Sequence, residues 1–145
     1  MSENRLSLRL VGELPPDQEL TAMFGVHPTT SRRRGMPIGR TGRPTTEDVW
    51  SVELISRSEW THSRPDVAAV DNALRQLQSM IPALSHLDRT RCRVQLYISS
   101  IREEEQGGFE LPAEFVAVAG AAHMEVFVSI LVDWPDDASE LSRQA

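Results

Sequence analysis

Four segments of the chain alternate apolar and polar residues with a period of two, which is typical of a β-strand with one buried face. In the first of them Leu6, Leu8 and Leu10 share one face, while Ser7 and Arg9 share the other. The four predicted strands cover residues 5–11, 49–55, 92–99 and 124–132.

Apolar residues at spacings of three and four predict three helices, each with an apolar stripe along one face. Pro15-Pro16-Asp17 opens the first helix and Gly25 ends it, since proline suits a first helical turn and glycine a C-terminal cap. The longest stripe consists of Val67, Val70, Leu74, Leu77, Ile81 and Leu84. Pro82 lies inside this stripe, so the helix is predicted to kink or restart near Ile81. The third helix covers about 112–119.

A strand, a Leu-Pro helix start, a short helix and a second strand occur twice, around Leu14-Pro15 and Leu111-Pro112. Each half is predicted to be a parallel strand–helix–strand unit with a right-handed crossover. The sequence therefore predicts an α+β fold: a two-layer sandwich with a four-stranded mixed sheet, three helices on one face, and a ferredoxin-like arrangement of pseudo-repeated halves.

Residues 27–47 form a long connection rich in glycine, proline and arginine. This composition predicts that the segment makes no packed element. Connections of this length inside a compact domain are usually functional or disordered, so the segment is the first place to look for a site.

The chain of 145 residues fits a single domain, with a core at about 5–132 and a flexible acidic tail at 133–145. No apolar run reaches the ~18 residues of a membrane helix, and no export signal is evident, so a cytoplasmic location is expected. All fifteen basic residues are arginine, which suggests the codon usage of a GC-rich genome. Cys92 is the single cysteine and is predicted to pack in the core.

The sequence contains no pattern that predicts catalysis, a metal site or a cofactor. There is no Gly-x-Ser-x-Gly elbow, no His pair at helical spacing and no calcium-loop pattern. An enzyme is therefore disfavoured, and His27 is the one residue where a catalytic role would be sought. A net charge of −6 and a pI of 5.2 also disfavour nucleic-acid binding.

Arginines are concentrated in the long connection, where they could bind an anionic ligand above an aromatic ring. The candidate ligand-binding residues are Arg32, Arg33, Arg34, Arg40, Arg43 and Trp50. The alternative is a solvated loop whose arginines pair with the protein's own carboxylates.

The sheet face opposite the predicted helices carries charged and aromatic side chains, which favours cross-strand ion pairs or a protein contact. The candidate interface residues are Arg9, Glu53, Arg93, Tyr97, Glu125 and Phe127. Because Tyr97 and Phe127 are expected on an uncovered face, a homodimer is predicted.

These features together resemble the bacterial domain-of-unknown-function family DUF4279. The resemblance spans about residues 5–132, and it is carried by the strands and helices above and by a set of short motifs. These motifs are Leu14-Pro15-Pro16, Phe24-Gly25, Arg33-Arg34-Gly35, Val49-Trp50-Ser51 and Asp133-Trp134. The resemblance implies the α+β architecture and a bacterial origin, and it transfers no catalytic residue.

The leading functional prediction is a non-enzymatic protein-interaction module of immunity-protein type, whose acidic surface pairs with a basic partner. It rests on size, charge and the absence of a catalytic pattern. The alternative prediction is a small anion-binding or sensor domain that uses the arginine-rich loop 32–43.

Overall fold

A computed structural model describes residues 2–38, 42–103 and 107–133, and shows a mixed five-stranded sheet in the order β2-β5-β1-β6-β7. The sheet strands are β1 (Ser2–Gly12), β2 (Thr30–Arg32), β5 (Asp48–Ile55), β6 (Cys92–Arg102) and β7 (Glu125–Val132). The helices are α1 (Asp17–Phe24), α2 (Val67–Met80) and α3 (Ala113–Ala121), with 3₁₀ turns at Arg57–Glu59 and Ile81–His86. A separate small hairpin pairs β3 (Pro37–Ile38) with β4 (Arg43–Pro44).

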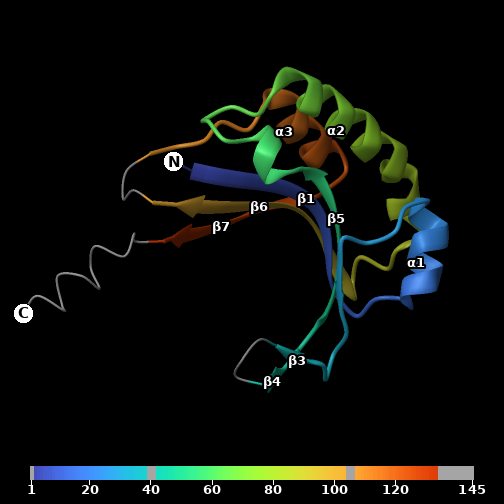
Figure 1. Cartoon of the computed structure of the whole chain (residues 1–145). Coiled ribbons are helices and arrows are strands. Elements are labelled where there is room, and N and C mark those ends of the chain that lie inside the picture. The colour runs from blue at the N-terminus through green and yellow to red at the C-terminus, as the bar shows by residue number, and fades with distance from the viewer. Residues whose placement is uncertain (1, 39–41, 104–106, 134–145) are drawn as a thin grey trace, which may run out of the picture.

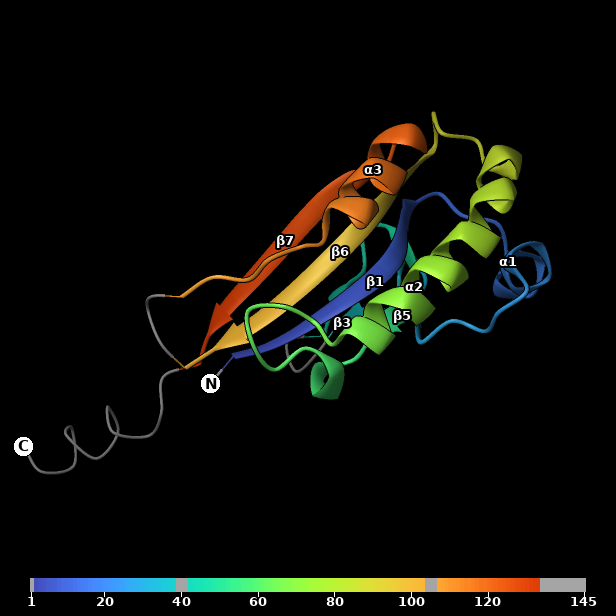
Figure 2. The same cartoon turned by 90° about the horizontal axis from the view of Figure 1, so that it is seen from above.

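Two layers form the fold, and all three α-helices lie on one side of the sheet (Figure 1, and from above in Figure 2). The predicted α+β class and the single helical layer are confirmed. The predicted count of four strands is wrong, because β2 adds a fifth strand to the sheet beside β5. The match to a ferredoxin-like arrangement is therefore partial.

The two halves of the chain differ in topology. In the second half β6 and β7 pair in parallel across α3, as predicted. In the first half β5 pairs antiparallel with β1, so the predicted parallel unit is wrong there. The reason is β2, which follows α1 and runs parallel to β1. The chain then reverses once more, and β5 lies between β2 and β1, antiparallel to both.

The described part of the long connection forms strands that the sequence did not predict. It contains β2 and the β3-β4 hairpin, and the backbone N–H of Thr29 donates to the carbonyl oxygen of Ser51 at 2.8 Å. Main-chain hydrogen bonds to β5, and not the burial of apolar side chains, hold β2 in place. The prediction that it makes no packed element is wrong.

The predicted helix boundaries are largely confirmed. Gly25 ends α1 in the left-handed conformation, at a φ of 73°. The long helix stops at Met80 and continues as the 3₁₀ turn that contains Pro82, which is the predicted restart. None of the described helices is long and apolar enough to span a membrane.

The core lies between the helices and the covered face of the sheet. Its largest fully buried side chains include Trp50, Trp60, Phe115, Leu77 and Met80. Cys92 is buried with them, as predicted, and burial raises the pKa of its thiol. The acidic tail, predicted to be flexible, lies outside the described residues from 134 onwards.

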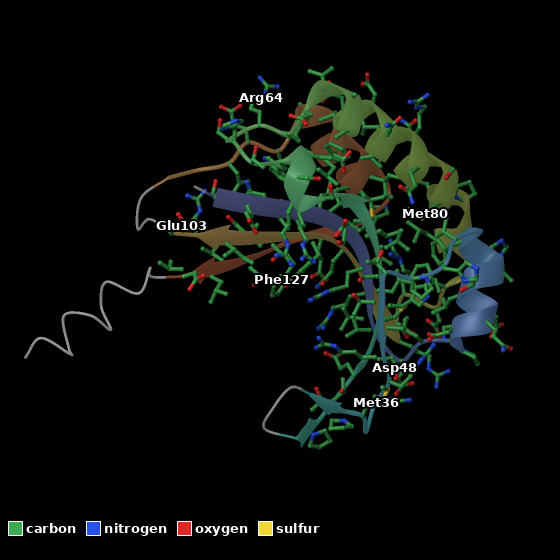
Figure 3. The ribbon with its side chains drawn as sticks, in the orientation of Figure 1. Met36, Asp48, Arg64, Met80, Glu103 and Phe127 are labelled. Atoms are coloured by element: carbon green, nitrogen blue, oxygen red, sulfur yellow. The ribbon has the colours of Figure 1, made fainter. Side chains whose placement is uncertain are left out.

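The uncovered face of the sheet is concave. Figure 1 shows β1 and β6 bending as they pass from the region beside β7 towards the region beside β5, with the helices on the outer side of the bend. In Figure 3 Phe127 projects from the inner side, whereas Met80, the last residue of α2, lies on the outer side. We call this concave surface the open face.

Candidate functional site

A pocket of about 300 Å³ lies on the open face, where β1, β2, β5 and β6 come together. The strand alternation that buries Leu6, Leu8 and Leu10 under the helices turns the intervening side chains of β1 into this pocket. The lining residues are Arg5, Ser7, Arg9, Thr30, Arg32, Val49, Ser51, Tyr97 and Ser99. We call this the arginine pocket, because three of its residues are arginine and none is acidic.

The Arg9 guanidinium is held against two aromatic rings. Its central carbon lies 4.1 Å from the ring centroid of Tyr97 and 5.0 Å from that of Phe127. The two rings stack with centroids 5.6 Å apart and an angle of 23° between their planes. Arg9 Nε also donates to Gln95 Oε1 at 3.0 Å. These contacts fix the position of the guanidinium before any ligand binds.

Positive charge in the pocket is poorly neutralised by the protein itself. Arg5 approaches Glu53 only at 3.9 Å, and within the described part of the chain neither Arg9 nor Arg32 has a carboxylate partner. Burial lowers the pKa of Arg9. Tyr97 and Glu47 act in the opposite direction, and the positive charges of Arg93 and Arg32 lower the pKa further. An anion in the pocket would relieve this crowding of like charges.

Hydroxyl groups surround the arginines. Ser7, Thr30, Ser51 and Ser99 line the pocket, and no described residue takes a hydrogen bond from or gives one to their side chains. A guanidinium donates in a fixed fork and a hydroxyl donates from a short, rotatable side chain, and both suit carboxylate or phosphate oxygens.

The arginines of the long connection have a different environment. Arg33 donates to the backbone carbonyl oxygens of Leu14 at 3.2 Å and Pro15 at 2.6 Å, and it forms ion pairs with Asp17 and Asp48. These contacts join the connection to the start of α1 and to the start of β5.

Asp48 is the buried acceptor at the centre of this network (Figure 3). Its carboxylate accepts from the backbone N–H groups of Leu14 at 3.0 Å and Arg34 at 2.9 Å. Burial acts to raise the pKa of Asp48, but these hydrogen bonds and the nearby Arg33 and Arg34 guanidinium groups outweigh it, and the pKa is lowered. The hydroxyl of Ser31, and then Arg33, lower the pKa of Asp17.

The structure therefore separates the six predicted ligand-binding residues. Arg32 lines the arginine pocket, whereas Arg33 and Arg34 belong to the Asp48 network. Trp50 is fully buried on the helix side of the sheet, with its ring 5.1 Å from that of Phe24. Arg40 and the side chain of Arg43 lie outside the described residues. These residues are close in sequence, but the sheet places Arg32 on the open face and Trp50 on the helix side.

The six predicted interface residues do share the open face. The strand registers place Gln95 beside both Arg9 and Glu125, and Tyr97 beside Phe127. Arg93 pairs with Glu47 at 3.2 Å at the edge of this surface. Their role in a protein contact stays a prediction.

Comparison with known families places the chain. A family model described as a domain of unknown function, DUF4279, matches residues 2–133. The chain belongs to this family. No curated protein and no solved structure matches it. The match covers every strand and helix described above, so the arginine pocket lies wholly within the DUF4279 domain.

Of the nine residues that line the pocket of this DUF4279 domain, sequence reasoning named only Arg9, Arg32 and Tyr97 as candidate site residues. Arg5 shares a strand face with Ser7 and Arg9, so the period of two that identified Arg9 could also have found Arg5. Thr30 belongs to β2, a three-residue strand with no apolar residue, and no pattern in the sequence predicts it.

The histidines of the DUF4279 domain do not form a site with these residues. His27, His62, His86 and His123 are exposed and lie in loops or at a helix end, as expected from the sequence. Within the described residues no group of three or more His, Cys, Asp or Glu side chains could hold a metal ion. His27 is exposed in the connection after α1, and no described residue contacts it as a catalytic partner.

Proposed function

We propose that this protein is a binding domain for a small anion, and that the anion occupies the arginine pocket. The observation that carries the proposal is the pairing state of Arg9 and Arg32. Both guanidinium groups line a concave surface, and neither has a carboxylate partner among the described residues. Six described arginines outside the pocket pair with carboxylates: Arg33, Arg34, Arg57, Arg64, Arg91 and Arg93. Arg75, Arg89 and Arg102 have no carboxylate partner among the described residues, but none of them lines the pocket.

Size and chemistry define the ligand class. A volume of about 300 Å³ is at the lower end of small-molecule pockets, about 300–1,000 Å³. Two or three guanidinium groups with several hydroxyls favour a group with two or three oxygens that share negative charge. Inorganic phosphate, a phosphate ester or a small dicarboxylate fits this description. The site differs from the predicted loop site, with which it shares only Arg32.

The test is a thermal-shift and calorimetric titration with sodium phosphate and with succinate at constant ionic strength. Wild type should be stabilised by at least one of the two ligands. Arg32→Ala should weaken binding at least about tenfold, since one charge-assisted hydrogen bond contributes about 1.5–3 kcal/mol. Arg32 is exposed, so the variant should fold normally.

The matched control is Arg75→Ala, which removes an exposed arginine on α2 whose contacts are to Asn72 and Asp71 of its own helix. This variant should bind as wild type does. No saturable binding of either ligand to wild type, or equal losses in both variants, would contradict the proposal.

A protein-interaction module of immunity type is the second proposal. It is supported by the net charge of −6 and by the open face, where Phe127 is 43% exposed beside charged side chains. A partner captured from lysate at low salt and released at high salt would support it. A bacterial origin in a GC-rich genome is likewise a proposal, supported by the exclusive use of arginine as the basic residue, and a cytoplasmic location is a separate proposal.

A further inference from the structure

The β7 strand forms an edge of the sheet and carries the largest group of exposed apolar side chains in the described chain. Val126, Val128, Ile130 and Val132 point to the helix side, while Phe127 and Leu131 point to the open face. All six are exposed, and Ile130 and Leu131 reach 58% and 59%. The described helices therefore leave side chains on both sides of β7 exposed.

The backbone of β7 has hydrogen-bonding groups that point away from the sheet. The N–H of Asp133 donates to the carbonyl oxygen of Arg102 on β6 at 2.7 Å. Because alternate residues of a strand direct their main-chain groups to the same side, Val126, Val128, Ile130 and Val132 direct theirs outward. No described strand pairs with that edge.

Proteins usually protect such an edge with lysine, proline, an inward-pointing charge or a bulge. Between Glu125 and Asp133 the β7 strand has no charged residue and no proline, and its pairing with β6 is regular over eight residues. An unprotected edge of this length is suited to accept another strand.

We propose that this edge binds the same edge of a second copy of the chain, so that two sheets join through antiparallel β7 strands about a two-fold axis. The six side chains expose on the order of 500 Å² per copy, at the upper end of the ~300–600 Å² patches of soluble monomers. Two such patches together expose on the order of 1,000 Å², which is the upper limit of what these side chains can bury and lies just below the ~1,200 Å² at which stable interfaces begin.

The distribution of charge along β7 favours a second β7 strand as the partner and also determines how the two strands pair. A second β7 strand presents the same uncharged centre, so an antiparallel pair buries no unpaired charge. An axis at Ser129 would place Glu125 of each copy opposite Asp133 of the other, which opposes two carboxylates. An axis at Val128 instead places Val126 opposite Ile130 and Val128 opposite itself, and it keeps the carboxylates apart.

This interface differs from the face-to-face dimer that the sequence suggested. It uses the edge of β7 and leaves the arginine pocket on the open face accessible in both copies, since the pocket lies on β1, β2, β5 and β6. The inference is therefore independent of the proposed anion binding, and either can fail without the other.

Sedimentation velocity of the full chain at several protein concentrations tests the proposal. Wild type should sediment as a species of twice 16.2 kDa that dissociates on dilution. Val128→Arg places an arginine opposite its own symmetry mate and should weaken association at least about a hundredfold, giving a monomer. Ile130→Arg, at the most exposed position on the helix side, should do the same.

Val67→Arg is the matched control, because Val67 is also an exposed valine, at 78%, but lies at the start of α2. It should remain dimeric. Circular dichroism and thermal unfolding establish that each variant is folded. A wild-type monomer at high concentration, or a folded Val128→Arg and Ile130→Arg that associate as wild type does, would overturn the proposal. So would loss of association in Val67→Arg.

Discussion

The guanidinium of Arg9 on β1 lies 4.1 Å from the ring centroid of Tyr97 on the neighbouring strand β6. The contact is diagonal, because the register places Tyr97 beside Ser7 and Arg9 beside Gln95. An arginine held by a ring and a neutral amide keeps its full charge and has a fixed position. That combination is what a preorganised anion site requires.

Replacing Tyr97 tests whether this preorganisation matters. Tyr97→Ala should weaken anion binding about five- to tenfold, because a cation–π contact of about 1 kcal/mol no longer restrains Arg9. Tyr97→Phe keeps the ring and should bind as wild type does. Calorimetric titration with phosphate or succinate compares the two. Equal losses in both variants would instead indicate that the phenol hydroxyl, and not the ring, is needed.

The Asp48 network predicts sensitivity to acid. The pKa of Asp48 is lowered in the folded chain from an ordinary value of 3.8. A lowered folded pKa contributes stability that is present above the unfolded pKa and is lost as pH falls through the folded pKa. The free energy of unfolding in urea should therefore fall as the pH drops below about 4.

Asp48→Asn should lower the free energy of unfolding at pH 7 by about 1–3 kcal/mol, because it leaves Arg33 and the Leu14 and Arg34 N–H groups with a weaker acceptor. Its further loss of stability between pH 5 and pH 3 should be smaller than that of wild type. Asp71→Asn, an exposed position on α2, serves as the control and should follow the wild-type curve. Identical acid curves for wild type and Asp48→Asn would contradict the account of this network.

A close backbone approach at the end of β1 predicts a strong effect at Gly12. Its φ is 133°, and a Cβ there would lie 2.5 Å from the carbonyl oxygen of Arg91 and 2.9 Å from the Cα of Cys92. Gly12→Ala should lower the free energy of unfolding by about 3 kcal/mol or more. At Gly25 an added Cβ would meet no atom within 4 Å, and only the left-handed backbone conformation disfavours it. Gly25→Ala should therefore lower the free energy of unfolding by about 1 kcal/mol. Urea denaturation of both variants measures the difference.

The single thiol should be unreactive in the folded chain. Cys92 is 5% exposed and burial raises its pKa, so little thiolate is accessible at pH 7. Iodoacetamide should label it at least about a hundredfold more slowly than it labels the urea-unfolded chain. Rapid stoichiometric labelling of the native chain would contradict this expectation and show that the start of β6 opens readily.

Much of the fold could be predicted because its main elements bury one regular face. The four long strands and the three helices follow from periods of two and 3.6, and Gly25 and Pro82 mark ends that the structure confirms. Strand β2 could not be found in this way. Thr30, Ser31 and Arg32 bury no apolar side chain, and main-chain hydrogen bonds to β5 hold the strand in the sheet.

The site was harder to predict than the elements. Arg32 lines the same pocket as Arg5 because β5 and β2 lie on the same side of β1 in the sheet, and this depends on sheet order, which no local pattern specifies. The cluster of arginines in the connection gave a misleading signal for the same reason. Alternation along β2 turns Arg32 to the open face, while Ser31 turns to the helix side and bonds to Asp17.

The arginine Nε–H resonances give the most direct test of the proposed anion site, because the chain has fifteen arginines and no lysine. We would assign the ¹⁵Nε spectrum by single substitutions and titrate with sodium phosphate, then with succinate, at constant ionic strength. The account predicts saturable shifts for Arg9 and Arg32, with Arg33 and Arg75 unchanged. Saturable shifts confined to Arg33 and Arg34, or none at any arginine, would contradict it.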